Sequence, residues 1–463
     1  MKMTIQVVME SEEHAEVVEE IACLKREELL PETLGLTLAE SKNILQKMQE
    51  ALVPAQVDEY IEHSHVCADC GHALGCKENR GIVVHSLFGK LTVSSPRFYT
   101  CSCQQRATKS FSPVASLLEN RKTPELQYLA VKAAALESYE LSAHWLREVL
   151  PLDQDVNATS VRRQVEEVAG KLDADLPEEE PTIEGCPRDW ARLPNPDKPI
   201  MVGLDGGYVP ARKGECKKGP AFEAIIGKSI PEGTKGKTFA FVDDDGKPRQ
   251  RLSEVLEAQG AQANQSITFL SDGGRNVREL PLYLYPNAEH ILDWFHITMR
   301  LTVMKQQAKG VKSEEDPALT GDLLREVERL KWYLWHGNVF QSLESIENLK
   351  FTLENGEDAS KTAKLRQSVH EMDSYIRINH AFIPNYGERY RYGERISTAF
   401  TESAVNQVLS KRMSKKQQMR WTRQGAHHLL QIRTRVLNGD LRHAFVQWYP
   451  GMQAGDGKTA DVV

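Results

Sequence analysis

Short apolar runs separated by polar turns occupy the middle of the chain. Between residues 200 and 296, five such runs are bounded by Gly, Pro and Asp, a pattern typical of buried strands. A helical pattern over Arg251–Gln259 lies between the third and the fourth run. We therefore expect a mixed α/β layer whose strands are Ile200–Leu204, Phe222–Gly227, Phe239–Val242, Ile267–Leu270 and Ala288–Leu292.

The first 60 residues have a helical pattern. Glu10–Leu30 is acidic and amphipathic, Pro31 interrupts the pattern, and Thr37–Leu52 resumes it with a cap at its start. We expect residues 1–60 to form a helical region with a solvated surface and no chemistry of its own.

Residues 120–175 contain three further helical segments with short connections. They cover Glu125–Ser138, Leu141–Leu150 and Thr159–Leu172, and Ser142 and Asn157 are candidate caps. This arrangement predicts a helix-turn-helix domain, whose last helix would present Arg162 and Arg163 to DNA. A small helical bundle with a solvated polar face explains the pattern equally well. Residues 176–198, rich in Pro and Glu, are expected to be a linker.

Helical spacing dominates again beyond His296. We expect residues 297–397 to be all-α, and another helix to begin near Thr398 with Glu402 in its first turn. An acid in the first turn is commonly explained by the helix dipole, so Glu402 alone indicates no function.

The composition is that of a soluble globular protein with two to four domains. The chain has 463 residues, 40% hydrophobic and 27% charged. No apolar run approaches the roughly 20 residues needed to span a membrane, and the N-terminus does not resemble a signal peptide. We therefore expect a cytoplasmic protein without a membrane partner.

The distribution of charge along the chain is more informative than the net charge. The net charge of −7 argues weakly against a uniformly basic nucleic-acid binder, but Lys411–Arg423 contains basic residues and no acid. A run of charge is usually a solvated face; here we expect a helix that faces DNA. Its contacts would be Lys411, Arg412, Lys415, Lys416, Arg420, Trp421 and Arg423.

Two close cysteine pairs flank a segment rich in strand formers. Cys67 and Cys70 form a C-x-x-C motif, and Cys101 and Cys103 follow about thirty residues later. In an intracellular chain these pairs favour a structural, tetrahedral Zn²⁺ over disulfides, so residues 61–110 are expected to be a zinc-ribbon-like module. Ordinary reduced cysteines are the alternative. The C-x-C spacing of the second pair also leaves other ligands open, namely Cys76, His63, His65, His72 and His85.

Three of the predicted strands end on an aspartate: Asp205, Asp272 and Asp293. Ligands gather at the carboxyl ends of strands in open α/β sheets, and carboxylates there suit a hard cation such as Mg²⁺. Asp205 and Asp272 are each followed by Gly-Gly, so a simple turn is the alternative explanation.

An aspartate after a first strand, another after a fourth strand and a glutamate on a later helix form the arrangement of a ribonuclease H-like core. On these residues the chain resembles the DDE class of bacterial insertion-sequence transposases, closest to the ISKra group, with likeness also to Mutator-type enzymes. The resemblance covers roughly Pro199 to Gly439. It is carried by Leu204-Asp205-Gly206, Ser271-Asp272-Gly273, Asp293-Trp294-Phe295-His296 and Thr401-Glu402-Ser403-Ala404-Val405-Asn406.

The resemblance implies a catalytic triad of Asp205, Asp272 and Glu402 that holds two Mg²⁺ (or Mn²⁺) ions. Strand cleavage would be hydrolysis of a DNA phosphodiester, and strand transfer would be attack by the freed 3′-hydroxyl. The catalytic core would comprise residues 199–296 and 398–440, separated by an all-α insertion over 297–397, with a tail over 441–463. Double-stranded DNA, both the element's terminal inverted repeats and the target, would be the partner of a homodimer.

Asp293 and His296 have two explanations. The resemblance implies that they lie beside the active site, where His296 could contact DNA or steady the local geometry. The alternative is a hydrogen-bonded pair that closes the fifth strand.

Two other functions compete with this expectation. One is a metal-dependent nuclease on the same core that cleaves DNA without joining strands. The other is a catalytically retired transposase kept as a DNA-binding regulator. The presence of all three acids disfavours the regulator.

Overall fold

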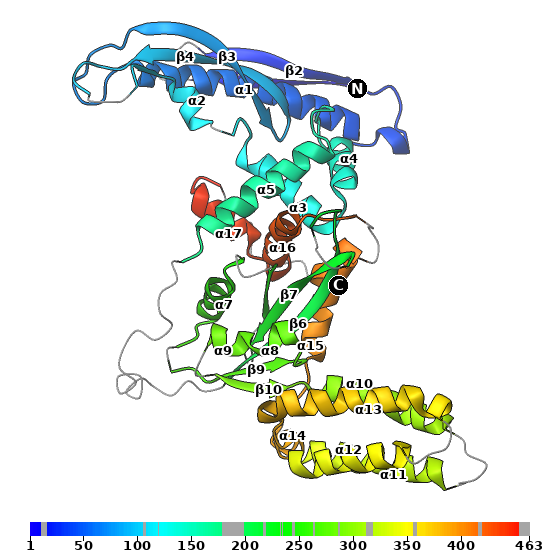
Figure 1. Cartoon of the computed structure of the whole chain (residues 1–463). Helices are drawn as coiled ribbons and strands as arrows, with labels where there is room; N and C mark the ends of the chain where they lie inside the picture. The colour runs from blue at the N-terminus through cyan, green and yellow to red at the C-terminus, as the bar shows by residue number, and fades with distance from the viewer. Residues whose placement is uncertain are drawn as a thin grey trace. The chain divides into compact units, whose positions relative to one another are not determined.

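The computed structural model divides into two compact units, which are described separately (Figure 1). The N-terminal unit is Met1–Gly170 with Gly439–Val463, and the central unit is Lys171–Asn438. The structure describes all residues except 11–15, 105–107, 119, 178–198, 216–218, 232, 234, 243–245, 263, 286–287, 312–317, 355–358, 415–418 and 453–463. The predicted linker therefore lies almost wholly outside the described residues.

The N-terminal unit begins with a β-hairpin rather than a helix. Strand β1 (Lys2–Met9) pairs antiparallel with β2 (Val17–Lys25), so the predicted helix over Glu10–Leu30 is wrong. Helix α1 (Leu38–Ser64) follows the short helix η1 (Pro31–Thr33) and starts with a capping box between Thr37 and Glu40. The hairpin packs on α1 through a small core of Ile21, Ala22, Ile44 and Ala51.

The cysteine-containing segment forms a three-stranded antiparallel sheet in the order β3-β4-β5. The two long strands pair over their full length, and their buried residues pack against α1 and α2. The strands and the helix that follows them are β3 (Cys76–Ser86), β4 (Gly89–Tyr99), β5 (Ser110–Phe111) and α2 (Pro113–Leu117).

The three helices expected in residues 120–175 are present. They are α3 (Pro124–Leu136), α4 (Tyr139–Val149) and α5 (Ala158–Ala174). Asn157 caps α5 as predicted, because its Oδ1 accepts the amides of Thr159 and Ser160 at 3.0 Å. Ser138 caps α4, whereas the predicted cap Ser142 is buried inside that helix.

The C-terminal segment is not a simple tail. Helix α17 (Leu441–Trp448) packs on α3, where Arg442 forms a bidentate ion pair with Glu125 at 2.7 Å. Phe445 meets the ring of Tyr128 edge-on. The predicted tail over 441–463 thus contributes to the helical part of the N-terminal unit, within the described residues.

The central unit contains a mixed five-stranded sheet in the order β10-β9-β6-β7-β8. Strands β6, β9 and β10 run parallel, whereas β7 is antiparallel to both β6 and β8. The prediction of a mixed α/β layer is therefore confirmed. The strands are β6 (Ile200–Pro210), β7 (Ala221–Ile230), β8 (Lys237–Phe241), β9 (Ile267–Ser271) and β10 (Glu289–Leu292).

Helices cover the two faces of this sheet differently. Ile200, Val202 and Leu204 of β6 share a core with apolar side chains of α7, α8 and α9. The alternate positions of β6, which point to the opposite face, approach α15 and the π-helix η4. These helices are α7 (Pro248–Glu257), α8 (Arg275–Arg278), α9 (Leu280–Leu284), α15 (Ala399–Val405) and η4 (Asn406–Ser414); α16 (Arg423–Asn438) packs beside β8.

The segment between β10 and α15 is helical, as predicted. Its members share one core with the end of β10 (Figure 1). They are α10 (Trp294–Gly310), α11 (Leu319–Trp335), α12 (Val339–Glu354), α13 (Ala359–Asn379), η3 (His380–Phe382) and α14 (Tyr386–Arg391). Among the described residues, no helix combines the length and the apolar character that a membrane crossing requires.

Candidate functional site

Three aspartates lie at the same level of three neighbouring parallel strands. Leu204 of β6 pairs with Ser271 of β9, and Ser271 pairs with Leu292 of β10. Since neighbouring strands lie about 4.8 Å apart, the residue after each of these positions falls in one row across the sheet. Those residues are Asp205, Asp272 and Asp293.

Two glycines beside Asp205 bring α15 close to β6. A Cβ atom on Gly203 would lie 1.8 Å from the Thr401 hydroxyl oxygen, and one on Gly207 would lie 3.3 Å from Val405. Alternate residues of a strand share a face, so Asp205 points to the face that α15 covers. The Gly-Asp pattern thus has a packing reason as well as a chemical one.

The carboxyl group of Asp205 is electrostatically strained. Its pKa is raised to about 6, mainly by burial; the charges of Asp272 and Asp293 contribute to the rise, while His296 and the Gly206 amide oppose it. Carboxylates held close together under partial burial repel each other unless a cation or a proton intervenes.

The Asp272 loop is fixed from two sides. The Asp272 carboxylate accepts the Gly274 amide at 2.8 Å, and the Tyr375 hydroxyl donates to the Asp272 carbonyl at 2.8 Å. Gly273 adopts a φ of +71°, and a Cβ there would lie 2.4 Å from Leu292. Only glycine fits at position 273, so Asp272 begins a tight turn. A turn at this position is compatible with a functional role for the Asp272 carboxylate.

Asp293 is fully buried and joins two helices. Its carboxylate accepts the Phe295 amide at 2.8 Å, which caps α10, and also the hydroxyl of Thr398 at the start of α15. Burial raises the pKa of this carboxyl group, while these hydrogen bonds and His296 oppose the shift. The His296 Nε2 lies 3.6 Å from the carboxylate. Asp293 therefore closes the fifth strand, and the partly exposed His296 is the member of the pair that can meet a ligand.

Glu402 lies in the first turn of α15, next to Thr401, and its side chain is exposed. Among the residues that the structure describes, the cysteine cluster is the only group of three or more possible ligands close enough to hold one ion, so Asp205, Asp272 and Glu402 form no such group. A site for two ions does not require all three carboxylates on the same ion. Asp205 lies on β6, Asp272 and Asp293 directly follow β9 and β10, and Glu402 lies on α15, which packs against β6.

The four predicted zinc ligands form a compact cluster. The Sγ atoms of Cys67 and Cys103 lie 3.5 Å apart, and Cys70 lies 3.4 Å from both Cys101 and Cys103. All four lie within 4.8 Å of one another. Tetrahedral Zn²⁺ with bonds of about 2.3 Å separates its sulfur ligands by about 3.8 Å. These cysteines could therefore hold a metal ion such as zinc.

Local backbone geometry supports this cluster. Gly71 adopts a φ of +71°, and its amide donates to the Cys67 carbonyl at 2.9 Å, which closes a tight knuckle. A hydrogen bond from the Cys103 backbone lowers the pKa of the Cys101 thiol to about 7, which favours the thiolate that metals bind. Cys76 and the four nearby histidines are not part of the cluster.

On α5, both predicted DNA contacts are exposed. Arg162 and Arg163 lie in the first half of the helix, and Arg162 is 3.6 Å from Glu166 one turn later. Thr159 is also exposed, whereas Gln164 is buried. A polar face with two adjacent guanidinium groups is available on this helix.

The basic segment differs from the expectation of a DNA-facing helix. Arg412 is fully buried and lies 5.4 Å from the ring centre of Trp421, which is also buried. Arg423 begins α16 and lies over the ring of Phe222 at 5.2 Å. Arg412 and Trp421 therefore pack inside the unit, and Arg423 is partly buried, each guanidinium group lying near an aromatic ring. Lys411 and Arg420 are exposed, and Lys415 and Lys416 lie outside the described residues.

Two residues at the site were not predicted to act there. Tyr375 reaches Asp272 across 103 positions of the chain, and Thr398 reaches Asp293 across 105. In the sequence, Thr398 is notable only as the position near which a helix is expected to begin, and Tyr375 carries no prediction of its own. No local pattern indicates such distant contacts.

Comparison with known proteins adds no assignment: no protein-family model matches this chain, and no curated protein is detectably related to it.

Proposed function

We propose that the protein is a DNA transposase that cleaves and joins DNA strands through Asp205, Asp272 and Glu402. The observation that carries the proposal is that Asp205, Asp272 and Asp293 each come directly after residues paired in register on β6, β9 and β10. Structural acids rarely gather on one edge of a sheet, because their charges repel each other unless a cation compensates them. The pKa of Asp205 is raised chiefly by burial, and the charges of Asp272 and Asp293 add to the rise.

The topology supports a ribonuclease H-like core. In such a core the first strand lies in the centre, pairs with an antiparallel second strand on one side and with a parallel fourth strand on the other. The order β10-β9-β6-β7-β8 agrees with this arrangement. On this assignment, α10 to α14 form an insertion between the fifth strand and the helix that carries Glu402.

Each residue has a distinct task in the proposed reaction. Two bound Mg²⁺ ions would activate the attacking oxygen and stabilise the leaving oxygen. Asp205, on the central strand, would hold the ions together with Asp272 and Glu402. Thr398 and Asp293 would set the position of α15 over the sheet, and the exposed edge of His296 would face the DNA backbone.

The N-terminal unit would supply DNA recognition. The four cysteines would hold a structural Zn²⁺ in place of a larger apolar core. Helix α5, as the last helix of a helix-turn-helix domain, would place Arg162 and Arg163 in the major groove of a terminal repeat.

Cleavage of the element's own end tests the proposal. The full chain is incubated with Mg²⁺ and a labelled DNA duplex. The duplex spans the boundary between the end of the element that carries the gene and the DNA next to it. We expect nicking at that boundary by the wild type. We expect cleavage to fall by about 1,000-fold or more for Asp205→Asn, Asp272→Asn and Glu402→Gln, with end binding retained, because the positioning of metal ions dominates phosphoryl transfer.

Glu257→Gln is the matched control, since Glu257 is an exposed acid on α7. It should cleave like the wild type. Measurable cleavage by all three site variants would contradict the assignment of the carboxylates. Cleavage without joining of the freed 3′ end to a target duplex would identify a nuclease, and specific binding without cleavage would identify the retired regulator.

A further inference from the structure

Glu223 is an acid near the row of aspartates that the proposed reaction does not use. It lies on β7 opposite Tyr208 of β6, three residues beyond Asp205. Opposite residues of paired strands share a face, as do alternate residues of one strand. Glu223 and Gly206 therefore lie on one face of the sheet, and Asp205 lies on the other. Glu223 is thus not on the face where the Asp205 carboxylate would bind ions.

The side chain of Glu223 is half-buried and contacts the backbone of β6. A Cβ atom added to Gly206 would overlap one oxygen of the Glu223 carboxylate. The other carboxylate oxygen accepts a hydrogen bond from the Nδ2 atom of Asn276 in α8. One side chain therefore connects the residue after Asp205 with the segment that follows Asp272.

Asn276 belongs to the turn that begins at Asp272. The Asp272 carboxylate accepts the Gly274 amide at 2.8 Å, and the Gly274 carbonyl accepts the amides of Val277 and Arg278 at 3.0 and 2.8 Å. Val277 is 2% exposed and packs in the same core as the apolar residues of β6. These contacts make the segment one compact turn, so a contact that holds Asn276 also limits the movement of Asp272.

Backbone pairing alone does not hold Asp272 beside Asp205. The pairing of β6 with β9 ends at Leu204 and Ser271, whereas β6 itself continues to Pro210. Asp205 therefore lies in a strand, and Asp272 lies in a turn just beyond one. Two metal ions about 4 Å apart require ligands that stay within about 0.5 Å of a fixed geometry. Side chains have to provide the fixed spacing that the backbone does not.

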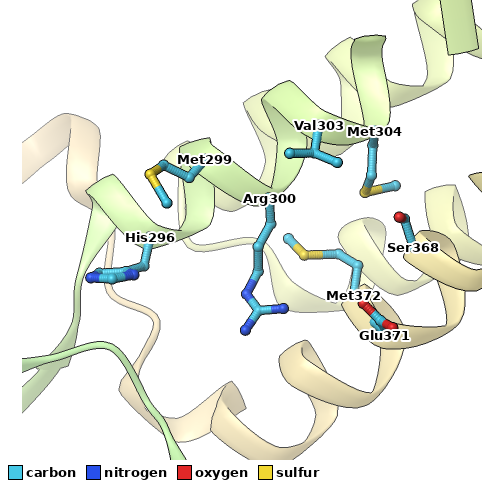
Figure 2. Close-up of a pocket in the computed structure, with 8 residues that line it drawn as sticks. All are labelled: His296, Met299, Arg300, Val303, Met304, Ser368, Glu371 and Met372. Atoms are coloured by element: carbon cyan, nitrogen blue, oxygen red, sulfur yellow. The ribbon is translucent and has the colours of Figure 1, made fainter. Parts of the chain in front are cut away.

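Helices α10 and α13 hold the other end of the turn. The Tyr375 hydroxyl donates to the Asp272 carbonyl at 2.8 Å, and the Arg300 guanidinium lies 4.3 Å from the centre of the Tyr375 ring. Figure 2 shows Arg300 extending from α10 into the space between the two helices. Tyr375 thus holds the turn at Asp272 itself, and Glu223 holds it at Asn276.

We propose that Glu223 is a positioning residue, which holds Asp272 at a fixed distance from Asp205 through its hydrogen bond to Asn276. The inference rests on the proposed function, which assigns metal ions to these two aspartates. A charged acceptor makes such a hydrogen bond about twice as strong as a neutral acceptor does. This gain explains an acid at a position that binds no ion.

Two measurements on the full chain test this role without DNA cleavage. Hydrogen exchange of residues 273–278, followed by mass spectrometry without metal, reports whether the turn is held. The EPR signal of free Mn²⁺ reports ion binding, and Asp272→Asn shows how much of that binding depends on the aspartates.

We expect Glu223→Ala to accelerate the exchange and to weaken Mn²⁺ binding, each about 10-fold, the order found when a residue behind a metal ligand is lost. Glu223→Gln keeps an acceptor for Asn276 and should stay within about 3-fold of the wild type in both measurements. Rescue by this uncharged variant distinguishes a positioning residue from an ion ligand.

Interchange of the donor and the acceptor gives a second test. Asn276→Asp places two carboxylates together, so this variant should behave like Glu223→Ala. The double variant Glu223→Gln/Asn276→Asp restores a hydrogen bond in the reverse direction, and it should recover slow exchange and Mn²⁺ binding. Glu257→Ala removes an exposed acid of α7 and is the matched control, which should behave like the wild type.

Each outcome separates the inference from the proposed function. Unchanged exchange and Mn²⁺ binding in Glu223→Ala would overturn the inference and leave the proposed reaction intact. Loss of Mn²⁺ binding in Glu223→Gln as complete as in Asp272→Asn would also overturn it, because Glu223 would then be an ion ligand. Defects in Glu223→Ala with recovery in the double variant would support the inference even if the wild type cut no DNA. Equal Mn²⁺ binding by the wild type and Asp272→Asn would contradict both the inference and the metal ions of the proposed function.

Discussion

The buried side chain of His290 lies next to the row of aspartates and affects the stability of the sheet. It lies on β10 with 9% of its surface exposed, and its Nε2 is 2.8 Å from the Ser271 hydroxyl, one residue before Asp272. Its ring packs 4.2 Å from that of Phe382. Burial lowers the pKa of His290 to about 4 from its ordinary 6.5, because the charged imidazolium would lose its hydration.

This shift predicts a specific dependence of stability on pH. Between the two pKa values the unfolded chain binds a proton at this residue and the folded chain does not, so the free energy of unfolding falls as the pH falls from 6.5 to about 4. The contribution of His290 is at most about 3 kcal/mol. His290→Gln should flatten the dependence, as measured by urea unfolding at about pH 7.5 and about pH 4.5.

A histidine exposed to solvent serves as the control. His370→Gln, on α13, should retain the pH dependence of the wild type. The free energy of unfolding could instead fall by the same amount between the two pH values in His290→Gln and in the wild type. In that case His290 would not be buried in its neutral form.

At the scale of elements, the contact between β6 and α15 depends on the absence of a side chain. Gly203 leaves room for Thr401 and Phe400, which lie 1.8 Å and 2.8 Å from the position that a Cβ would occupy. Gly203→Ala should therefore push α15 away from the sheet and lower the free energy of unfolding by about 1–3 kcal/mol. Cleavage should fall as well, because Glu402 moves with the helix.

Gly170→Ala is the opposite case and the matched control. Gly170 lies in α5 with no atom within 4 Å of an added Cβ, so alanine should raise stability by up to about 1 kcal/mol. Thermal unfolding of both variants measures these two changes in stability. Equal effects of the two substitutions would mean that α15 does not approach β6 as closely as described.

The elements that the sequence predicts well are those with a regular apolar period. The five strands of the central sheet end in short apolar runs before Gly, Pro or Asp, and all five are present. The hairpin at the N-terminus lacks such a period. Ile5 pairs with Ala22 and Gln6 pairs with Glu20, so Ile21 is an extra residue that breaks the alternation. The bulge makes β2 resemble an amphipathic helix.

Some residues of the candidate site could likewise be predicted from the sequence, and others could not. Asp205 and Asp272 follow short apolar runs, and the cysteine pairs have metal-ligand spacing, so each could be found from adjacent residues. The strand end expected at Leu204 is wrong, because β6 continues through Asp205 to Pro210. The burial of Arg412 against Trp421 could not, because the charge of a segment does not reveal which of its side chains face a core. Such burial depends on contacts between distant parts of the chain.

For the whole molecule, the two compact units have separate cores and divide the proposed tasks. The cysteine cluster belongs to the N-terminal unit and the aspartate row to the central unit. A metal ion on the cysteines would stabilise only the core it borders, because domains with their own cores unfold as separate units.

This division leads to a prediction for metal removal. The purified chain should contain about one zinc ion, lost in a Cys67→Ser/Cys70→Ser variant, because that pair supplies half of a four-ligand site. Hydrogen exchange should then accelerate in β3 and β4 and stay unchanged in β6 and β9. Mass spectrometry measures both the metal content and the exchange.

Cys76→Ser provides the comparison, because Cys76 is an exposed cysteine at the start of β3 that is not in the cluster. It should retain the zinc ion and normal exchange. A native mass without metal for the wild type would contradict the zinc assignment.

The bond between Thr398 and Asp293 has a consequence for the order in which the chain folds. It closes a loop of 105 residues, which in an unstructured chain would cost about 4 kcal/mol of entropy. Helices α10 to α14 form among themselves by local contacts and shorten that loop, so α15 can dock only after they have packed. During synthesis, Asp205 and Asp272 therefore emerge and fold well before Glu402 can join them. On the proposed function, a growing chain would have no cleavage activity until α15 has docked and brought Glu402 to the sheet.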